Sequence, residues 1–209
     1  MRSPVRLVVF DFDGVVRHHD SIHEAEAARA VQLAPGQLAS IAFQRDLLSQ
    51  MVEGGLRRED WIREVGQQVG AVDGVLDREA AVDVVARWLA DWGWVDPEML
   101  AVVQTLRDAG HRVALLTNGT DTTDAELVHH RVDHLFDPVF NSWHLGVAKP
   151  DPRVFQYVTD TVDIAPNEVT FFDDTLANVT AAQGFGWRAH HVTSVDGVRR
   201  VLRRHGLLA

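Results

Sequence analysis

The chain contains no cysteine and only one lysine among its 20 basic residues. Without cysteine it has neither disulfides nor thiolate metal ligands. It also lacks any uninterrupted apolar run approaching the roughly 18 residues that a membrane span needs. The first apolar run, residues 7–10, is cut by Asp11 and Asp13, too early for a signal peptide. These absences predict a cytoplasmic protein without a membrane partner.

An excess of positive charge is missing as well. The formal net charge is −10, whereas a nucleic-acid partner requires a basic surface. We therefore expect no nucleic-acid partner, and any recognition of a phosphate group must be local. At 209 residues and 46% hydrophobic, the chain is long enough for one sizeable core with a small inserted lobe.

Strand-like and helix-like segments alternate in most of the chain. Short runs rich in β-branched or aromatic residues predict strands at 5–10, 111–117, 138–142, 169–174 and 188–192. Between about 20 and 93 the apolar spacing is helical throughout, with helices expected at 21–33, 36–54, 58–70 and 77–92. Alternation of strands and helices predicts a doubly wound α/β core with a parallel sheet, formed by residues 1–16 and 97–209. Residues 17–96 are predicted to be an all-helical insert.

Chemically capable residues follow four of the predicted strands. In doubly wound sheets, ligands bind at the carboxyl ends of the strands. The residues concerned are Asp11 and Asp13, then Thr117, Asn118 and Gly119, then Lys149 in a loop, and finally Asp173 and Asp174. If these strands are neighbours, the four carboxylates and the lysine sum to a charge of −3. Such a site requires a hard divalent cation, and Mg²⁺ is the usual one beside phosphate.

Four segments carry a specific family resemblance: DFDGVV, LLTNGT, GVAKPDPRVF and FFDDTLANVTAAQGFG. Their residues and their order resemble the four sequence motifs of the haloacid dehalogenase-like superfamily. The resemblance implies a Rossmann-like core and a helical cap inserted after the first motif. It also implies a hydrolase that works through an aspartyl-phosphate and uses Mg²⁺.

The resemblance assigns a role to each matching position. Asp11 is the nucleophile and Asp13 the general acid and base. Thr117, Asn118, Gly119 and Lys149 are predicted to hold the phosphoryl group of the substrate, and Thr117 and Lys149 are counted as catalytic. The expected metal ligands are Asp11, the Asp13 backbone carbonyl and Asp174, with Asp173 supporting either the water shell of the metal or Lys149. Arg17 and His18, at the entrance to the predicted cap, either contact the substrate or belong to a solvated hinge.

These features predict a phosphatase that hydrolyses a small phosphorylated metabolite. Asp13 argues against a true dehalogenase, since the dehalogenases of the superfamily lack that second aspartate. The order of the motifs argues against a phospho-acceptor receiver domain. A phosphomutase, which shares all four motifs, remains an alternative, as does a ligand-binding or regulatory protein that kept the fold. The substrate and the choice between monomer and homodimer stay open.

Overall fold

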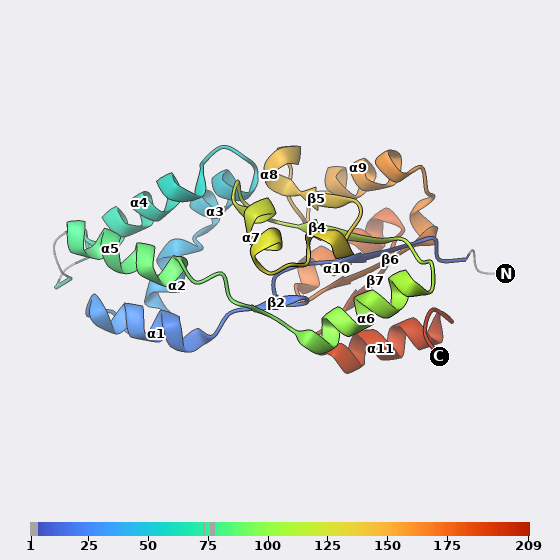
Figure 1. The fold of residues 1–209 in the computed structure, drawn as a ribbon. Coiled ribbons are helices and arrows are strands. Elements are labelled where there is room, and N and C mark those ends of the chain that lie inside the picture. The colour runs from blue at the N-terminus through green and yellow to red at the C-terminus, as the bar shows by residue number, and fades with distance from the viewer. Residues whose placement is uncertain (1–3, 73, 76–77) are drawn as a thin grey trace.

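The computed structural model describes residues 4–72, 74–75 and 78–209. Its centre is a five-stranded parallel sheet in the order β5-β4-β1-β6-β7 (Figure 1). The strands are β1 (Leu7–Phe10), β4 (Val113–Thr117), β5 (Val139–Asn141), β6 (Val169–Asp173) and β7 (Arg188–His191). Every residue of β1, β4 and β6 is buried, as the apolar runs predict for a sheet covered on both faces. The predicted α/β fold is therefore confirmed.

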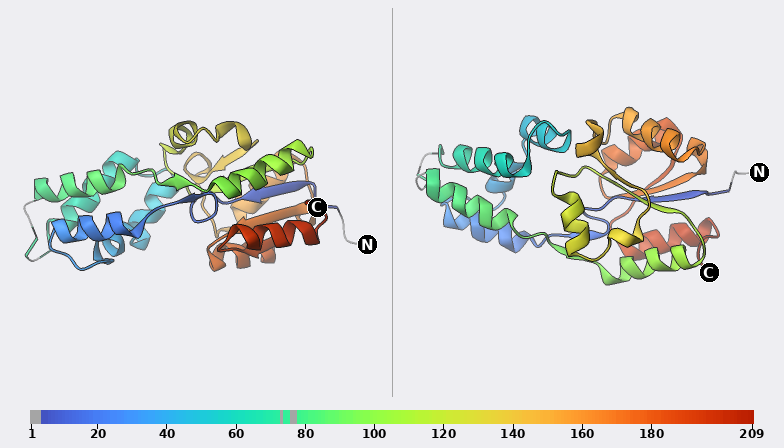
Figure 2. Two further views of the ribbon diagram at one scale, coloured as in Figure 1. Left: turned by 60° about the horizontal axis from the view of Figure 1, so that its bottom comes forward. Right: turned by 45° about the horizontal axis from the view of Figure 1, so that its top comes forward.

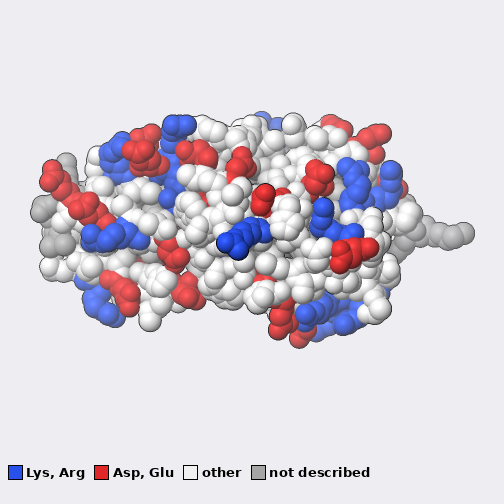
Figure 3. Space-filling view, viewed as in Figure 1, with Lys and Arg blue, Asp and Glu red and all other residues white. Residues whose placement is uncertain are grey.

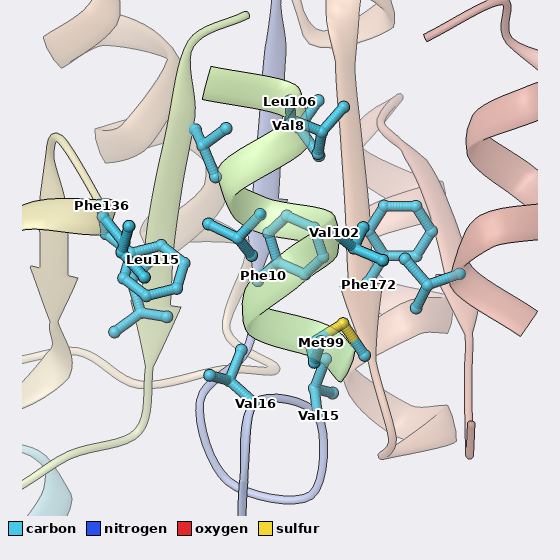
Figure 4. Packing of buried hydrophobic residues seen from close by; sticks show 14 of the residues in the cluster. Val8, Phe10, Val15, Val16, Met99, Val102, Leu106, Leu115, Phe136 and Phe172 are labelled. Atoms are coloured by element: carbon cyan, nitrogen blue, oxygen red, sulfur yellow. The ribbon is translucent and has the colours of Figure 1, made fainter. Parts of the chain in front are cut away.

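Helices cover both faces of this sheet (Figures 1 and 2). Side chains alternate along each strand, so each face has its own apolar cluster. On one face α6 (Pro97–Asp108) and α11 (Val195–Arg204) pack against the strands; Figure 4 shows Phe10 and Phe172 beneath Val102 of α6. On the other face lie α9 (Pro152–Val162) and α10 (Leu176–Phe185). The shorter elements are α7 (Thr123–His129), α8 (Ser142–Leu145) and the 3-10 helices Asp133–Leu135 and Pro166–Glu168.

The predicted helical insert leaves and rejoins the core through two paired strands. β2 (Arg17–His18) and β3 (Trp94–Val95) run antiparallel, with Arg17 opposite Val95. Between them lie α1 (Ser21–Ala30), α2 (Gln37–Ala42), α3 (Arg45–Val52), α4 (Arg58–Val69) and α5 (Arg78–Leu89). These helices share a separate apolar cluster, to which the core contributes Ala148. The division into two domains, at residues 16/17 and 96/97, stays a prediction.

One expected helix is wrong in its extent. The apolar spacing predicted a single helix over 36–54, but α2 ends at Ala42 and α3 begins at Arg45. The indole Nε1 of Trp61 donates to the Ala42 carbonyl at 3.1 Å, so a side chain from α4 satisfies a carbonyl at the end of α2. Phe43 packs against the Trp61 ring, with the ring centres 5.9 Å apart. Neither glycine nor proline marks this break in the sequence, and the contacts that accompany it come from another helix.

The helical segment lies against the carboxyl edge of the sheet at two places. A Cβ atom on Gly54, between α3 and α4, would come within 2.5 Å of the Trp143 carbonyl oxygen, so only a glycine allows this approach. At the start of α4, the Arg58 amide donates to Asp121 Oδ1 at 2.8 Å.

Acidic and basic side chains are interspersed on the face seen in Figure 3. Among the described residues, none of the helices has the length and hydropathy that a transmembrane span requires.

Candidate active site

Three of the predicted site residues stand at the carboxyl ends of neighbouring strands. Asp11 directly follows β1, Thr117 ends β4 and Asp173 ends β6. The register pairs Phe10 with Phe172, and the Asp11 amide donates to the Phe172 carbonyl at 2.9 Å. All three residues are buried. The structure thus brings together side chains that are far apart in the sequence.

Lys149 holds the centre of this group. Its Nζ lies 2.8 Å from Asp11 Oδ1 and 2.8 Å from Asp173 Oδ2, and it donates to the Leu116 carbonyl at 2.9 Å. These contacts use all three donors of the ammonium. Burial lowers the pKa of Lys149, but the two carboxylates outweigh that effect and raise it above its ordinary value. The only lysine in the chain is therefore a buried, charged residue between two acids.

The backbone around Lys149 is fixed by Asn118. The Lys149 amide donates to Asn118 Oδ1, and Asn118 Nδ2 donates to the Lys149 carbonyl, both at 2.8 Å. The Asn118 side chain therefore positions Lys149, while its predicted contact with substrate stays a prediction. Next to it, a Cβ on Gly119 would come within 2.4 Å of Thr123 Oγ1 and 2.6 Å of Asn141 Oδ1. Glycine is thus required there by the packing of the loop.

Three acids form a group suited to a cation. Carboxylate oxygens of Asp11, Asp173 and Asp174 all lie within 4.8 Å of one another, and the described residues contain no second group of this kind among His, Asp and Glu. The donor set is oxygen only, which suits Mg²⁺. A Cβ on Gly14 would come within 2.0 Å of Asp174 Oδ2, so the glycine leaves the space that this carboxylate occupies. The residues present therefore fit a divalent cation. The Asp13 side chain is outside this group, and a role for its carbonyl stays a prediction.

Burial makes the acid group costly without a cation. It raises the pKa of Asp11 well above the ordinary value, with Lys149 opposing this shift and Asp173 adding to it. Burial and Asp173 also raise the pKa of Asp174. A bound cation would favour the ionised form of Asp11 and of Asp174, because only a carboxylate coordinates a metal ion. For Asp11 the ionised form is also the one that can attack phosphorus.

Asn178 is a site residue that the sequence analysis missed. Its Nδ2 lies 3.1 Å from each carboxylate oxygen of Asp173, and the Thr175 amide donates to Asp173 Oδ1 at 2.8 Å. These donors orient a carboxylate that is completely buried. The only signal in the sequence is the position of Asn178, in the first turn of the helix after the acidic pair.

Asp13 is bound by Arg17, the first residue of β2. Arg17 Nε donates to Asp13 Oδ1 at 2.7 Å and Arg17 Nη2 to Oδ2 at 2.9 Å, while His19 Nε2 lies 3.5 Å from Oδ1. Burial would raise the pKa of Asp13, but His19 and Arg17 outweigh it and hold the pKa well below the ordinary value. Arg17 Nη1 also donates to Glu126 Oε2 at 2.6 Å. The predicted contact of Arg17 with substrate stays a prediction; in this structure its guanidinium binds two carboxylates.

His18 lies differently from Arg17. Its ring packs against the Trp94 ring, with centres 5.0 Å apart. Together with Gly14, Asp96 and Met99 it lines a cavity of about 270 Å³. A substrate contact for His18 likewise stays a prediction.

The acids and the lysine at the strand ends, and the order of their motifs in the sequence, agree with one superfamily of hydrolases. The family model described as haloacid dehalogenase-like hydrolase matches residues 5–186. The chain belongs to this family, as the sequence motifs predict. Among curated proteins it is similar to a sesquiterpene phosphatase of Aspergillus oryzae, with 26% identity and 92% of each chain covered. It is also similar to a D-ribitol-5-phosphate phosphatase of Bacteroides thetaiotaomicron, with 23% identity over 88% of this chain and 89% of that one.

Dehalogenases are relatives too. An (S)-2-haloacid dehalogenase of Burkholderia cepacia is 33% identical over 44% of this chain, and the match spans only 40% of the dehalogenase's length. Among solved structures, the magnesium complex of a HAD family enzyme from Bacteroides thetaiotaomicron has a TM-score of 0.76 at 19% identity, covering 96% of this chain and all of that one. The L-2-haloacid dehalogenase of Xanthobacter autotrophicus has a TM-score of 0.66 at 23% identity, covering 96% and 83%. At these identities the structural likeness shows the fold alone.

Proposed function

We propose that this protein is a Mg²⁺-dependent phosphatase that hydrolyses small phosphate monoesters through an aspartyl-phosphate on Asp11. One observation carries the proposal: three acids lie close enough together to hold a cation, a buried ammonium lies between two of them, and a further carboxyl group, Asp13, lies two residues from the nucleophile. Displacement of a halide needs no group to protonate the leaving atom, whereas displacement of an alkoxide does. Asp13 and the cation-binding acids therefore support phosphoryl transfer over dehalogenation.

The hydrogen bonds of Asp11 indicate which oxygen attacks. Oδ1 accepts from the Phe12 amide at 2.7 Å and lies 2.8 Å from Lys149 Nζ. We therefore assign the attack on phosphorus to Oδ2. The new Oδ2–P bond forms as the ester P–O bond breaks, and the bonding pair goes to the leaving oxygen. Because His19 and Arg17 hold the pKa of Asp13 low, Asp13 must first turn one oxygen away from Arg17 and take up a proton from solvent. It then gives this proton to the leaving oxygen and becomes a carboxylate.

The second half of the reaction regenerates the protonated Asp13 and the Asp11 carboxylate. The Asp13 carboxylate takes a proton from water as the water oxygen bonds to phosphorus. The Oδ2–P bond then breaks, and its electron pair restores the Asp11 carboxylate. Asp11, Asp173 and Asp174 would hold Mg²⁺, which when bound offsets negative charge on the phosphate. Lys149 keeps Asp11 and Asp173 in place throughout.

The function is tested by phosphate release from p-nitrophenyl phosphate and from a panel of sugar phosphates and other small phosphate esters, with Mg²⁺ and with EDTA. We expect turnover that requires the metal. Asp11→Asn should abolish it, because an amide cannot form the acyl-phosphate, while the circular dichroism spectrum remains that of the wild type. Halide release from a 2-haloacid is measured in parallel.

Two outcomes would contradict the proposal. Folded protein that releases no phosphate from any ester would exclude the phosphatase, and halide release with retained activity in EDTA would establish a dehalogenase instead. Phosphate release by Asp11→Asn at the wild-type rate would remove Asp11 from the nucleophile role. Transfer of the phosphate to a second sugar hydroxyl, rather than to water, would identify a phosphomutase.

A further inference from the structure

Glu126 is a buried acid with no part in the chemistry described so far. It lies in α7, and its side chain is 5% exposed. Its Oε2 accepts from Arg17 Nη1 at 2.6 Å, and its Oε1 accepts from Thr122 Oγ1 at 2.6 Å. A carboxylate so deeply buried is costly unless a cation compensates it. Arg17 is that cation, so the position of the guanidinium depends on Glu126.

Arg17 is shared between two carboxylates. Its side chain is 8% exposed, and its guanidinium carbon lies 4.4 Å from the centre of the Phe12 ring. Nε and Nη2 bind Asp13, whereas Nη1 binds Glu126. The planar guanidinium can bind both acids at once because its donors point in fixed, different directions.

A second cation approaches this network from the helical segment. Arg58 Nε, at the start of α4, lies 3.9 Å from Glu126 Oε1. Another nitrogen of the same side chain, Nη2, donates to the Leu89 carbonyl in α5. The contacts thus run without interruption from α4 and α5, through Glu126 and Arg17, to Asp13.

This arrangement has a consequence for Asp13. Both of its carboxylate oxygens accept hydrogen bonds from Arg17, and its side chain is 46% exposed on the other side. To serve a leaving oxygen, Asp13 must turn one oxygen away from the guanidinium. Glu126 provides an acceptor that stays with Arg17 when this happens, so the buried guanidinium keeps a charged partner.

We propose, on the basis of the phosphatase function above, that Arg17 and Glu126 are positioning residues: Glu126 retains the Arg17 guanidinium so that Asp13 can turn between Arg17 and the substrate. Without the Glu126 charge, Asp13 is the one carboxylate that still binds Arg17 in the described part of the chain, and that pair becomes stronger. Asp13 then turns to the substrate less readily, and protonation of the leaving oxygen becomes slower.

The test compares two esters that differ in their need for Asp13. An alkyl phosphate has a basic leaving oxygen that must be protonated, whereas p-nitrophenolate leaves without much help. The quantity to measure is kcat/KM, since it reports the steps up to loss of the leaving group and excludes hydrolysis of the phosphoenzyme. For Glu126→Gln we expect kcat/KM to fall about 10-fold or more on the alkyl ester and less than about 3-fold on the aryl ester.

Two further variants make the result interpretable. Glu98→Gln removes a carboxylate that accepts from Arg199 at 2.9 Å on the exposed side of α6, and it should change neither ester's kcat/KM. Arg17→Lys keeps the positive charge but loses the planar set of donors. A single ammonium cannot bind Asp13 and Glu126 in this way, so no second acid retains it when Asp13 turns. We therefore expect the same selective loss as for Glu126→Gln, which provides a second test if Glu126→Gln does not fold.

Each result of these assays supports or overturns the positioning role of Arg17 and Glu126. A selective loss on the alkyl ester supports the positioning role. Equal losses on both esters, or wild-type values in both variants, overturn it and leave the phosphatase function intact. If the wild-type protein hydrolyses neither ester, the proposed function falls and this proposal falls with it.

Discussion

Lys149 offers a direct test of how the acid group is held together. Lys149→Met keeps most of the aliphatic stem and removes the ammonium. It deletes the contacts with Asp11 Oδ1 and Asp173 Oδ2 at 2.8 Å and the hydrogen bond to the Leu116 carbonyl at 2.9 Å. Two buried carboxylates then face each other without the charge between them.

The expected loss of stability is large. Removal of one partner from a buried ion pair costs about 3–5 kcal/mol, because the other charge stays buried and uncompensated. Total stabilities of native domains are about 5–15 kcal/mol, so the change consumes a large share. We expect the free energy of unfolding in EDTA to fall by about 3 kcal/mol or more.

Urea unfolding followed by circular dichroism measures this change. Two comparisons separate charge from packing. The double variant Lys149→Met/Asp11→Asn has one fewer uncompensated carboxylate, so it should recover about 1–3 kcal/mol of the loss. Added Mg²⁺ should stabilise Lys149→Met more than the wild type, because the cation supplies the missing positive charge.

The stability deficit of Lys149→Met should change with pH in one definite direction. Burial raises the pKa of Asp11 above its value in the unfolded chain, and Lys149 opposes that shift. In Lys149→Met the folded state therefore takes up a proton at higher pH, and its deficit in stability should shrink as the pH is lowered from 8 towards about 5. A variant within about 1 kcal/mol of the wild type at pH 8 in EDTA would refute the reasoning, as would a deficit that grows at lower pH.

Two further predictions concern the metal site and the helical segment. Gly14→Ala should raise the Mg²⁺ concentration for half-maximal activity at least about 10-fold, because the added Cβ would meet Asp174 Oδ2; Gly110→Ala, which has φ +83° against +79° at Gly14 but no neighbour within 4 Å, is the matched control and should leave it unchanged. Equal effects of the two substitutions would assign the change to backbone strain instead. We also propose that residues 17–96 form a cap that moves over the site, since their helices have their own apolar cluster and connect to the core through β2 and β3. Small-angle scattering should show a smaller radius of gyration with Mg²⁺ and aluminium fluoride than without them, and identical profiles would argue against a moving cap.

The sequence by itself was sufficient for the fold class and for the candidate residues at the ends of the strands, but not for Asn178 or Glu126. Short apolar runs such as residues 7–10 contain too many β-branched residues for helices and are fully apolar, which predicts buried parallel strands. Because parallel strands meet at one edge of a sheet, Asp11, Thr117 and Asp173 could be placed together without coordinates. The start of α11 is equally local, because the hydroxyl of Ser194, the residue before it, accepts from the Gly197 amide.

The tertiary structure alone decided how those residues are held. Nothing near Arg17 in the sequence indicates that it binds Glu126, which is 109 residues away, and nothing near Lys149 indicates that Asn118 fixes its backbone. The break between α2 and α3 depends in the same way on Trp61 of another helix. Local patterns determine which segments become strands and helices, because these depend on backbone preference and periodic burial. Partners of buried charges and of helix-end carbonyls depend on which surfaces meet, and only the folded chain determines that.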